Sequence, residues 1–130
     1  MLKSRKSIVK KLDSVFSQYI RLRKSKNAIS ECYTCGKQDH WKNLQCGHFM
    51  SRKHYSTRWE ELNCQVQCYG CNISRYGEQF KFGLRLNKEY GKDTAEILER
   101  QCRTIMKFSN SDLLEKIEHY KSLAKQFGGY

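Results

Sequence analysis

The sequence predicts a small α+β domain, stapled by a zinc ion and flanked by α-helices, on three observations. Two Cys-x-x-Cys pairs, Cys32/Cys35 and Cys68/Cys71, lie 33 positions apart. Apolar residues between the pairs are spread among polar ones, as in short strands, whereas the segments on either side show helical periodicity. With 130 residues and a hydrophobic content of 38%, the chain is expected to form one domain whose modest core a metal ion would help to hold together.

Residues 4–26 are predicted to form a single helix with one apolar stripe and a largely basic remainder. The stripe consists of Ile8, Leu12, Val15, Phe16, Tyr19 and Ile20. This helix has two interpretations, a packing helix with a solvated face or a basic arm that lies across phosphates. Opposite faces of one helix can serve both purposes.

The middle of the chain is predicted to hold a zinc-binding turn, two strands and a helix. Residues 30–37 form the turn, and residues 38–48 and 57–66 form the strands, which a basic loop connects. A helix over residues 72–90 follows and ends at Gly91.

Two further helices are predicted to complete the chain. Asp93-x-x-Glu96 has the pattern of a capping box, and the inward residues of its helix would be Ile97, Leu98, Cys102, Ile105 and Met106. Ser109 is expected to cap the last helix, with Leu113, Leu114, Ile117, Tyr120, Ala124 and Phe127 inward. The chain thus divides into a basic N-terminal helix (1–29), a zinc-bound core (30–91) and a helical extension (92–130).

The charge balance indicates an anionic partner. The chain has 25 Lys and Arg against 13 Asp and Glu, a net charge of +12, and residues 1–26 contain nine of these bases with Asp13 as their single acid. Such a balance favours DNA or RNA. A membrane surface is the weaker alternative, because the sequence has no lipidation motif and no apolar run that could cross a bilayer. With no signal peptide, the expected location is the cytoplasm.

Seven cysteines in a chain without an export signal favour metal ligands over disulfides. Thiolates at i and i+3 across a tight turn can chelate one ion, and two such turns close a four-cysteine structural site. Cys64 lies four positions before Cys68 and could compete as a ligand, but the pair Cys68/Cys71 repeats the spacing of the first pair. Cys102 is expected in the core, and Cys46 is expected to be an inward strand residue.

Three polar residues near the second pair provide the groups that phosphodiester hydrolysis needs. A neutral histidine, His48, can be the general base for the attacking water near pH 7, and Asn72 can hold Mg²⁺ through its amide oxygen. Asn63 can hydrogen-bond the backbone of the loop that carries His48. Contacts with the nucleic acid are assigned to Arg52, Lys53, His54, Arg58 and Arg75.

At these residues the chain resembles a known family. Asn63, Cys68, Cys71 and Asn72, in the register N-x4-C-x2-C-N, resemble the second half of an HNH endonuclease. Over about residues 30–91 the chain is similar to the phage NinG (Rap) recombination nucleases, on Gln45-Cys46-Gly47-His48-Phe49, Arg58-Trp59, Asn63, Gln67-Cys68, Cys71-Asn72 and Gly77. Phage endonuclease VII is more distantly similar in the design of its site.

The resemblance implies a zinc-stabilised ββα-metal (His-Me finger) fold and endonuclease action on branched DNA, such as D-loops and Holliday junctions, in the cytoplasm of the host cell. It implies that His48 is the general base, that Asn63 orients the site and that Asn72 holds Mg²⁺, which Mn²⁺ can replace. It also makes the two cysteine pairs the ligands of a structural zinc. In the wider HNH pattern an aspartate precedes the histidine, whereas this chain has Gly47. His54 or Asp39 are alternatives for that missing ligand.

Two other functions remain open from the sequence. An HNH nicking or restriction-type endonuclease acting on linear duplex fits the charge and the site equally well. A non-catalytic zinc-dependent DNA-binding module would require neither His48 nor Asn72, so their presence argues against it. Symmetric cleavage of a junction requires two active sites, and the chain is therefore a candidate homodimer.

Overall fold

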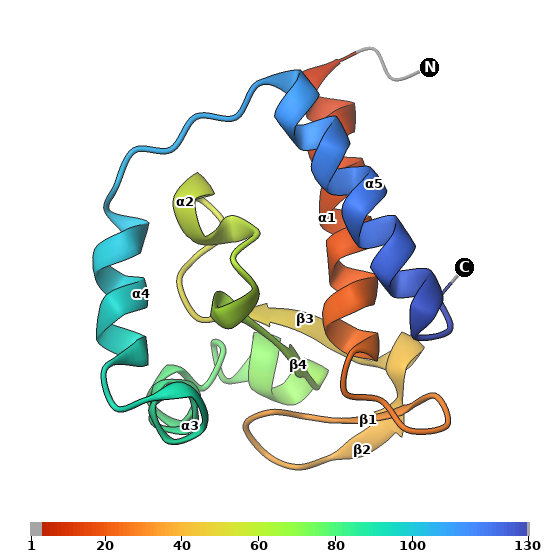
Figure 1. Ribbon diagram of the computed structural model, residues 1–130. Coiled ribbons are helices and arrows are strands. Elements are labelled where there is room, and N and C mark those ends of the chain that lie inside the picture. The colour runs from red at the N-terminus through yellow and green to blue at the C-terminus, as the bar shows by residue number, and fades with distance from the viewer. Residues whose placement is uncertain (1–3, 130) are drawn as a thin grey trace.

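The computed structural model describes residues 4–129 and shows two short antiparallel β-ribbons, of which β3–β4 lies among the helices and β1–β2 lies at the lower edge (Figure 1). The elements are α1 (Arg5–Leu22), β1 (Ile29–Glu31), β2 (Gln38–His40), β3 (Gln45–His48), α2 (Tyr55–Arg58), β4 (Cys64–Gln67), α3 (Gln79–Tyr90), α4 (Thr94–Cys102) and α5 (Asn110–Gln126). Short 3₁₀ turns lie at Trp41–Asn43 and Glu61–Asn63, and a π-helix spans Gly70–Ser74. Within residues 4–129, none of these helices has the length and apolar character that a bilayer span requires.

The first and last helices, α1 and α5, lie side by side and run in the same direction (Figure 1). The predicted stripe of α1 is buried except for the half-buried Tyr19, and α1 ends four residues earlier than expected. Ser109 and Asp112 form a capping box at the start of α5, which confirms the predicted cap. On α5 the predicted core positions Leu113, Ile117, Tyr120 and Ala124 are buried, whereas Leu114 and Phe127 are exposed, contrary to expectation.

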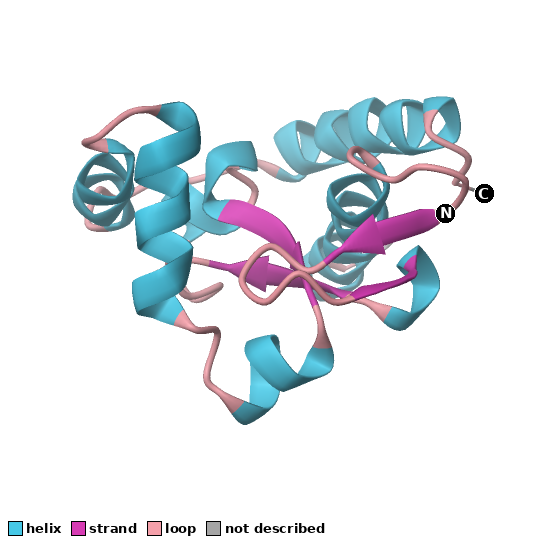
Figure 2. Cartoon of the chain, turned by 90° about the horizontal axis from the view of Figure 1, so that it is seen from below, coloured by secondary structure: helices cyan, strands magenta, loops and turns pink. Residues whose placement is uncertain are grey.

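The two ribbons differ from the predicted pair of strands. β1 pairs with β2, and β3 pairs with β4 in a register that places His48 opposite Cys64. The expected strand 38–48 is interrupted at Trp41–Asn43, where the His40 side chain accepts a hydrogen bond from the Lys42 amide and stabilises a 3₁₀ turn. The expected strand 57–66 is wrong over most of its length, because α2 and a second 3₁₀ turn occupy that segment. Figure 2 shows the strands at the centre with helices around them.

The helix expected over 72–90 is wrong in its first part. Tyr76, Gly77 and Glu78 adopt left-handed φ angles of 56°, 90° and 49°, and three such residues in succession cannot belong to a right-handed helix. Asn72 therefore lies in the π-helix, and α3 begins only at Gln79. The end of α3 at Gly91 is as expected.

The helix after Gly91 is shorter than expected. Asp93 occupies the N-cap position without a capping hydrogen bond from its side chain, so the predicted capping box is wrong. Instead, the Asn87 side chain on α3 accepts a hydrogen bond from the Ala95 amide at 2.8 Å. Leu98 and Cys102 are buried as expected, but Ile97, Ile105 and Met106 are exposed, the last two because α4 already ends at Cys102.

Candidate metal centre and catalytic cleft

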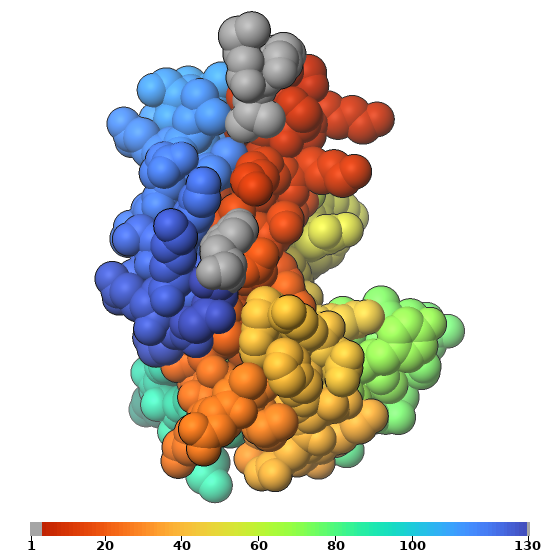
Figure 3. Space-filling view, turned by 90° about the vertical axis from the view of Figure 1, so that its right-hand side faces the viewer, coloured from red at the N-terminus to blue at the C-terminus, as the bar shows by residue number. Residues whose placement is uncertain are grey.

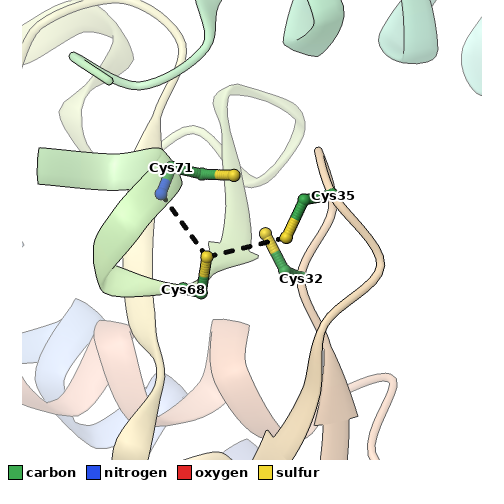
Figure 4. Close-up of side chains that lie close together, drawn as sticks. All are labelled: Cys32, Cys35, Cys68 and Cys71. Atoms are coloured by element: carbon green, nitrogen blue, oxygen red, sulfur yellow. Dashed lines mark hydrogen bonds between the residues drawn. The ribbon is translucent and has the colours of Figure 1, made fainter. Parts of the chain in front are cut away.

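Four cysteines meet between the two ribbons (Figure 4). Cys32 and Cys35 lie on the turn between β1 and β2, Cys68 directly follows β4, and Cys71 lies within the π-helix. Their sulfur atoms all lie within 4.8 Å of one another, and the Sγ atoms of Cys35 and Cys68 are 3.7 Å apart. This donor set fits the tetrahedral thiolate coordination of zinc, so the four residues could hold a structural zinc ion.

Nearby donors favour the thiolate form of Cys32, whereas burial and the neighbouring thiols raise the pKa of Cys35. The Cys71 amide donates to Cys68 Sγ at 3.4 Å, and Arg75 Nη2 donates to Cys71 Sγ at 3.1 Å. Burial opposes ionisation of Cys32, but the amide groups of Cys68, Thr34 and Cys35 outweigh it and lower the pKa of the Cys32 thiol to about 6. Cys64 lies apart from these four, next to Cys46 and His48, so the choice of Cys68 and Cys71 as the second pair agrees with the structure.

A cleft of about 570 Å³ opens between α1, β3 and the segment that follows the second cysteine pair. Figure 3 shows the surface hollowed between α1, in red, and residues around 70–80, in green. Its lining includes Asp13, Arg21, Cys46, His48, Arg52 and Asn72. The cleft thus brings together two of the three residues that were predicted to be catalytic.

His48 lies at the end of β3 and is held in one orientation. Its Nε2 is 2.9 Å from the carbonyl oxygen of Arg58. A carbonyl only accepts, so Nε2 carries the hydrogen and Nδ1 keeps its lone pair in the neutral ring. Burial lowers the pKa of His48 to about 4, although the bond to Arg58 acts in the opposite direction. The imidazole is therefore neutral at pH 7 and able to accept a proton.

Asn63 is fully buried and its side chain binds the loop after His48. Oδ1 accepts from the Met50 amide at 2.8 Å, and Nδ2 donates to the carbonyls of Met50 and Thr57 at 3.1 and 3.0 Å. The Asn63 carbonyl also accepts from the Phe49 amide at 2.8 Å. These contacts are of the kind that the sequence suggested for this asparagine.

Asp13 is a residue that the sequence analysis did not single out. Its carboxylate accepts from Arg58 Nε and Nη2 at 3.1 and 2.5 Å, and from Trp59 Nε1 at 3.0 Å. Because the Arg58 carbonyl in turn accepts from His48, Asp13 connects α1 to the imidazole. The sequence feature that could have indicated this role is that Asp13 is the single acid among nine bases and lies next to Leu12 of the apolar stripe, which is buried.

Asn72 enters the cleft from the π-helix. Its Nδ2 donates to Gln45 Oε1 at 2.7 Å, so the amide oxygen is the atom left for a cation. Asp13 is the one carboxylate among the described residues that line the cleft, and Arg58 already occupies it. A site with an amide oxygen and few carboxylates fits Mg²⁺, because this ion keeps several of its water ligands and also binds phosphate oxygens of the substrate.

Gly47 is required by its neighbour Gln67. A Cβ atom at position 47 would lie 1.9 Å from Gln67 Oε1. Gln67 cannot easily move, since it is fully buried and its Nε2 donates to Thr34 Oγ1 and to the Gly77 carbonyl, both at 2.9 Å. The packing of Gln67 therefore leaves no room for an aspartate side chain at position 47.

The residues assigned to nucleic-acid contact have different environments. Arg52 lines the cleft with its side chain 62% exposed, and Lys53 is exposed beside it. His54 precedes α2. Arg58 points inward to Asp13 with its side chain 16% exposed, and Arg75 binds Cys71 and Glu78. Asp39, the alternative metal ligand, bonds Asn43 and the His40 amide and is not among the described residues that line the cleft.

Residues 1–128 match the family model described as the bacteriophage lambda NinG protein. The matched range contains both cysteine pairs and every residue of the cleft named above. No curated protein and no solved structure matches the chain.

Proposed function

Because this chain belongs to the NinG family, which is related to phage recombination, we propose that it is a Mg²⁺-dependent DNA endonuclease. The observation that carries the proposal is the cleft in which a neutral histidine and an asparagine lie beside a four-cysteine cluster. The paired strands β3 and β4 precede the π-helix and α3 along the chain, an order similar to that of a ββα-metal core, with His48 at the end of the first strand. This order supports an HNH-like interpretation of the core.

The chemistry follows from the contacts of His48. The lone pair of Nδ1 takes a proton from the attacking water, and the Arg58 carbonyl stabilises the imidazolium that forms. Asn72 would hold Mg²⁺, and Mn²⁺ in its place. When bound, the metal supplies positive charge for the oxygens that become more negative in the transition state. Arg21 and Arg52 line the same cleft and face a phosphate placed there.

DNA is the proposed substrate, in branched form. The net charge of +12 favours a polyanion. Along α1, Lys6, Lys10, Asp13, Ser17 and Arg21 are spaced by four, three, four and four residues, so they share one face of the helix. The last three line the cleft, and a basic stripe thus leads along α1 to the site. The preference for branches comes from the relation of the family to recombination.

The test is cleavage of a labelled four-way junction and of linear duplex with the same sequence, each with Mg²⁺, with Mn²⁺ or with EDTA. We expect cutting with either metal, preference for the junction, and loss of at least about a hundredfold in the His48→Ala variant with binding retained. His119→Ala, at an exposed position of α5, is the matched control.

Equal cutting of both substrates would favour a nicking nuclease on linear duplex. Tight binding without cutting in any metal would leave a non-catalytic DNA-binding module and reject the proposal.

A further inference from the structure

A second group of side chains with metal-ligand chemistry lies at the floor of the cleft. Cys46 and His48 are two residues apart on β3 and share one face of the strand, and Cys64 on β4 is the register partner of His48. One donor atom from each of these three residues lies within 4.8 Å of the other two. The proposed nuclease chemistry uses the imidazole but neither thiol.

We propose that Cys46, His48 and Cys64 form a second metal site, selective for a thiophilic divalent cation such as Zn²⁺. Ligand atoms around tetrahedral zinc lie roughly 3.5–4 Å apart, since Zn–S and Zn–N bonds are about 2.3 and 2.0 Å long. The observed limit of 4.8 Å between the three donor atoms is close to this spacing. Mg²⁺ does not compete, because it prefers oxygen ligands. Both thiols release their protons to solvent when the metal binds.

The surroundings distinguish this site from an ordinary pair of core cysteines. Cys46 is only half-buried and lines the open cleft, so a metal ion reaches it from solvent. Cys64 is fully buried, and its thiol contacts the Arg58 carbonyl at 3.7 Å and the Cys46 thiol. Arg21 lines the same cleft, and Arg23 donates to the Cys64 carbonyl at 2.7 Å. Burial and the neighbouring Cys46 thiol raise the pKa of the Cys64 thiol well above its ordinary value, against a smaller lowering effect of Arg23, so binding of the metal must displace this proton. Three protein ligands leave a fourth position for water, as in an open zinc site.

A metal ion bound at this site would prevent His48 from acting as the general base. This consequence rests on the proposed function. A metal ion on Nδ1 takes the lone pair that would accept the proton. A metal ion on Nε2 displaces the bond to Arg58, and the single ring hydrogen then resides on Nδ1. Either mode leaves His48 unable to accept a proton. The structure therefore assigns Zn²⁺ two opposite effects, stabilisation at the four-cysteine cluster and inhibition at the cleft.

The binding test uses the full chain with zinc already loaded at the four-cysteine cluster. It is equilibrated with buffered free Zn²⁺ under reducing conditions, and bound zinc is counted by elemental analysis and native mass spectrometry. We expect the parent to take up a second equivalent. A Cys46→Ser, Cys64→Ser double variant should keep the first equivalent and lose the second. Cys102→Ser, which alters another buried cysteine, should keep both.

A parent that never exceeds one equivalent, or a double variant that retains two, would overturn the site. If the buried Cys64→Ser change prevents folding, Cys46→Ser alone tests the same claim at a half-buried position. Protection of Cys46 from alkylation by iodoacetamide in the presence of Zn²⁺ is an independent readout, and unchanged alkylation would contradict the proposal.

The activity test compares cleavage rates in Mg²⁺ with and without added Zn²⁺. We expect Zn²⁺ to inhibit the parent at least tenfold and to inhibit Cys46→Ser much less. Binding of the second zinc without inhibition would overturn its inhibitory role. A parent that binds two zinc ions but cuts under no condition would reject the nuclease function while leaving the metal site in place.

Discussion

At the scale of single residues, the site depends on a chain of contacts that ends at His48. Asp13 holds the Arg58 side chain, the Arg58 carbonyl holds the imidazole, and Asn63 holds the loop between them. None of these supporting groups needs to touch DNA. Each restricts the orientation of His48, the proposed base, and such restriction is the usual requirement for a preorganised site.

The pKa of His48 leads to a pH prediction. Burial lowers this pKa from its ordinary value of 6.5 to about 4, and Asp13, Arg52 and Arg58 are the charged neighbours. Cutting requires the neutral ring, so the rate should persist as pH falls from 7 to 5 and drop only as pH approaches 4. The rate of an ordinary histidine base would already fall near pH 6.5. A rate profile measured at saturating Mg²⁺ decides between the two.

The same shift has a consequence for stability. The unfolded chain protonates His48 near pH 6.5 and the folded chain only near pH 4. The contribution to the free energy of unfolding is therefore complete above pH 6.5 and is lost as pH falls towards 4. It amounts to about 3 kcal/mol. Denaturant unfolding of the parent and of His48→Gln should show a smaller loss between pH 7 and pH 4.5 in the variant.

Asp13→Ala should lower the free energy of unfolding by about 2–4 kcal/mol, because it leaves Arg58 and the Trp59 indole without their acceptor. Asp93→Ala is the matched control, since Asp93 is exposed and makes no capping bond. It should change stability by less than about 0.5 kcal/mol. Equal effects of both substitutions in denaturant unfolding would contradict the role of Asp13.

At the scale of elements, the four-cysteine cluster joins the β1–β2 ribbon, which has little other support, to the β3–β4 ribbon, which packs against α1. β1 and β2 are three residues each. The apolar cluster at this position contains only Leu44 and Val66 besides three of the cysteines. Elements this short are not stable alone, so the cross-link between the turn after β1 and the π-helix sets the position of Asn72.

Removal of zinc should therefore unfold the centre of the chain. A Cys68→Ala, Cys71→Ala double variant, or the parent treated with a strong chelator, should lose the structural metal and on the order of 5 kcal/mol of stability. Circular dichroism in denaturant measures the stability, and metal analysis measures the bound zinc. Cys102→Ser should keep its zinc. Full zinc content in the double variant would show that the ligands are elsewhere.

At the scale of the whole molecule, α1 is part of the core. It packs on α5 and on β3 and β4, so a truncation before Asn27 would remove core residues along with charge. The apolar stripes of α1 and α5 are buried against each other and are not available to a partner. The predicted homodimer therefore needs a different surface. Dimerisation stays a prediction, which sedimentation measurements would test.

Charge changes on the face of α1 that leads to the cleft test its contact with phosphates. Lys6→Gln with Lys10→Gln, both at exposed positions, should weaken DNA binding. The slope of log affinity against log salt should become shallower by about two, because about one counterion is released for each phosphate contact. Lys125→Gln on α5 is the control and should leave the slope unchanged. An unaltered slope in the double variant would assign DNA to another face.

The chemistry of the chain could be predicted from the sequence wherever it depends on local spacing. Two Cys-x-x-Cys turns specify a four-thiolate cluster, the periodicity of residues 4–26 specifies the buried face of α1, and Ser109 with Asp112 specifies the start of α5. Each cysteine pair, each repeat of the stripe and the cap involves residues within one or two turns of each other, whereas the meeting of the two cysteine pairs spans 33 positions. The geometry of the local features follows from the backbone alone.

The tertiary structure alone decided which distant residues meet. Left-handed residues at 76–78 delay α3 and leave Asn72 in the cleft, and Gln67 excludes a side chain at position 47. Asp13 reaches Arg58 across 45 positions of sequence, and Cys64 reaches His48 through the register of β3 and β4. Such contacts depend on how elements pack and pair, and neither periodicity nor spacing along the chain contains that information.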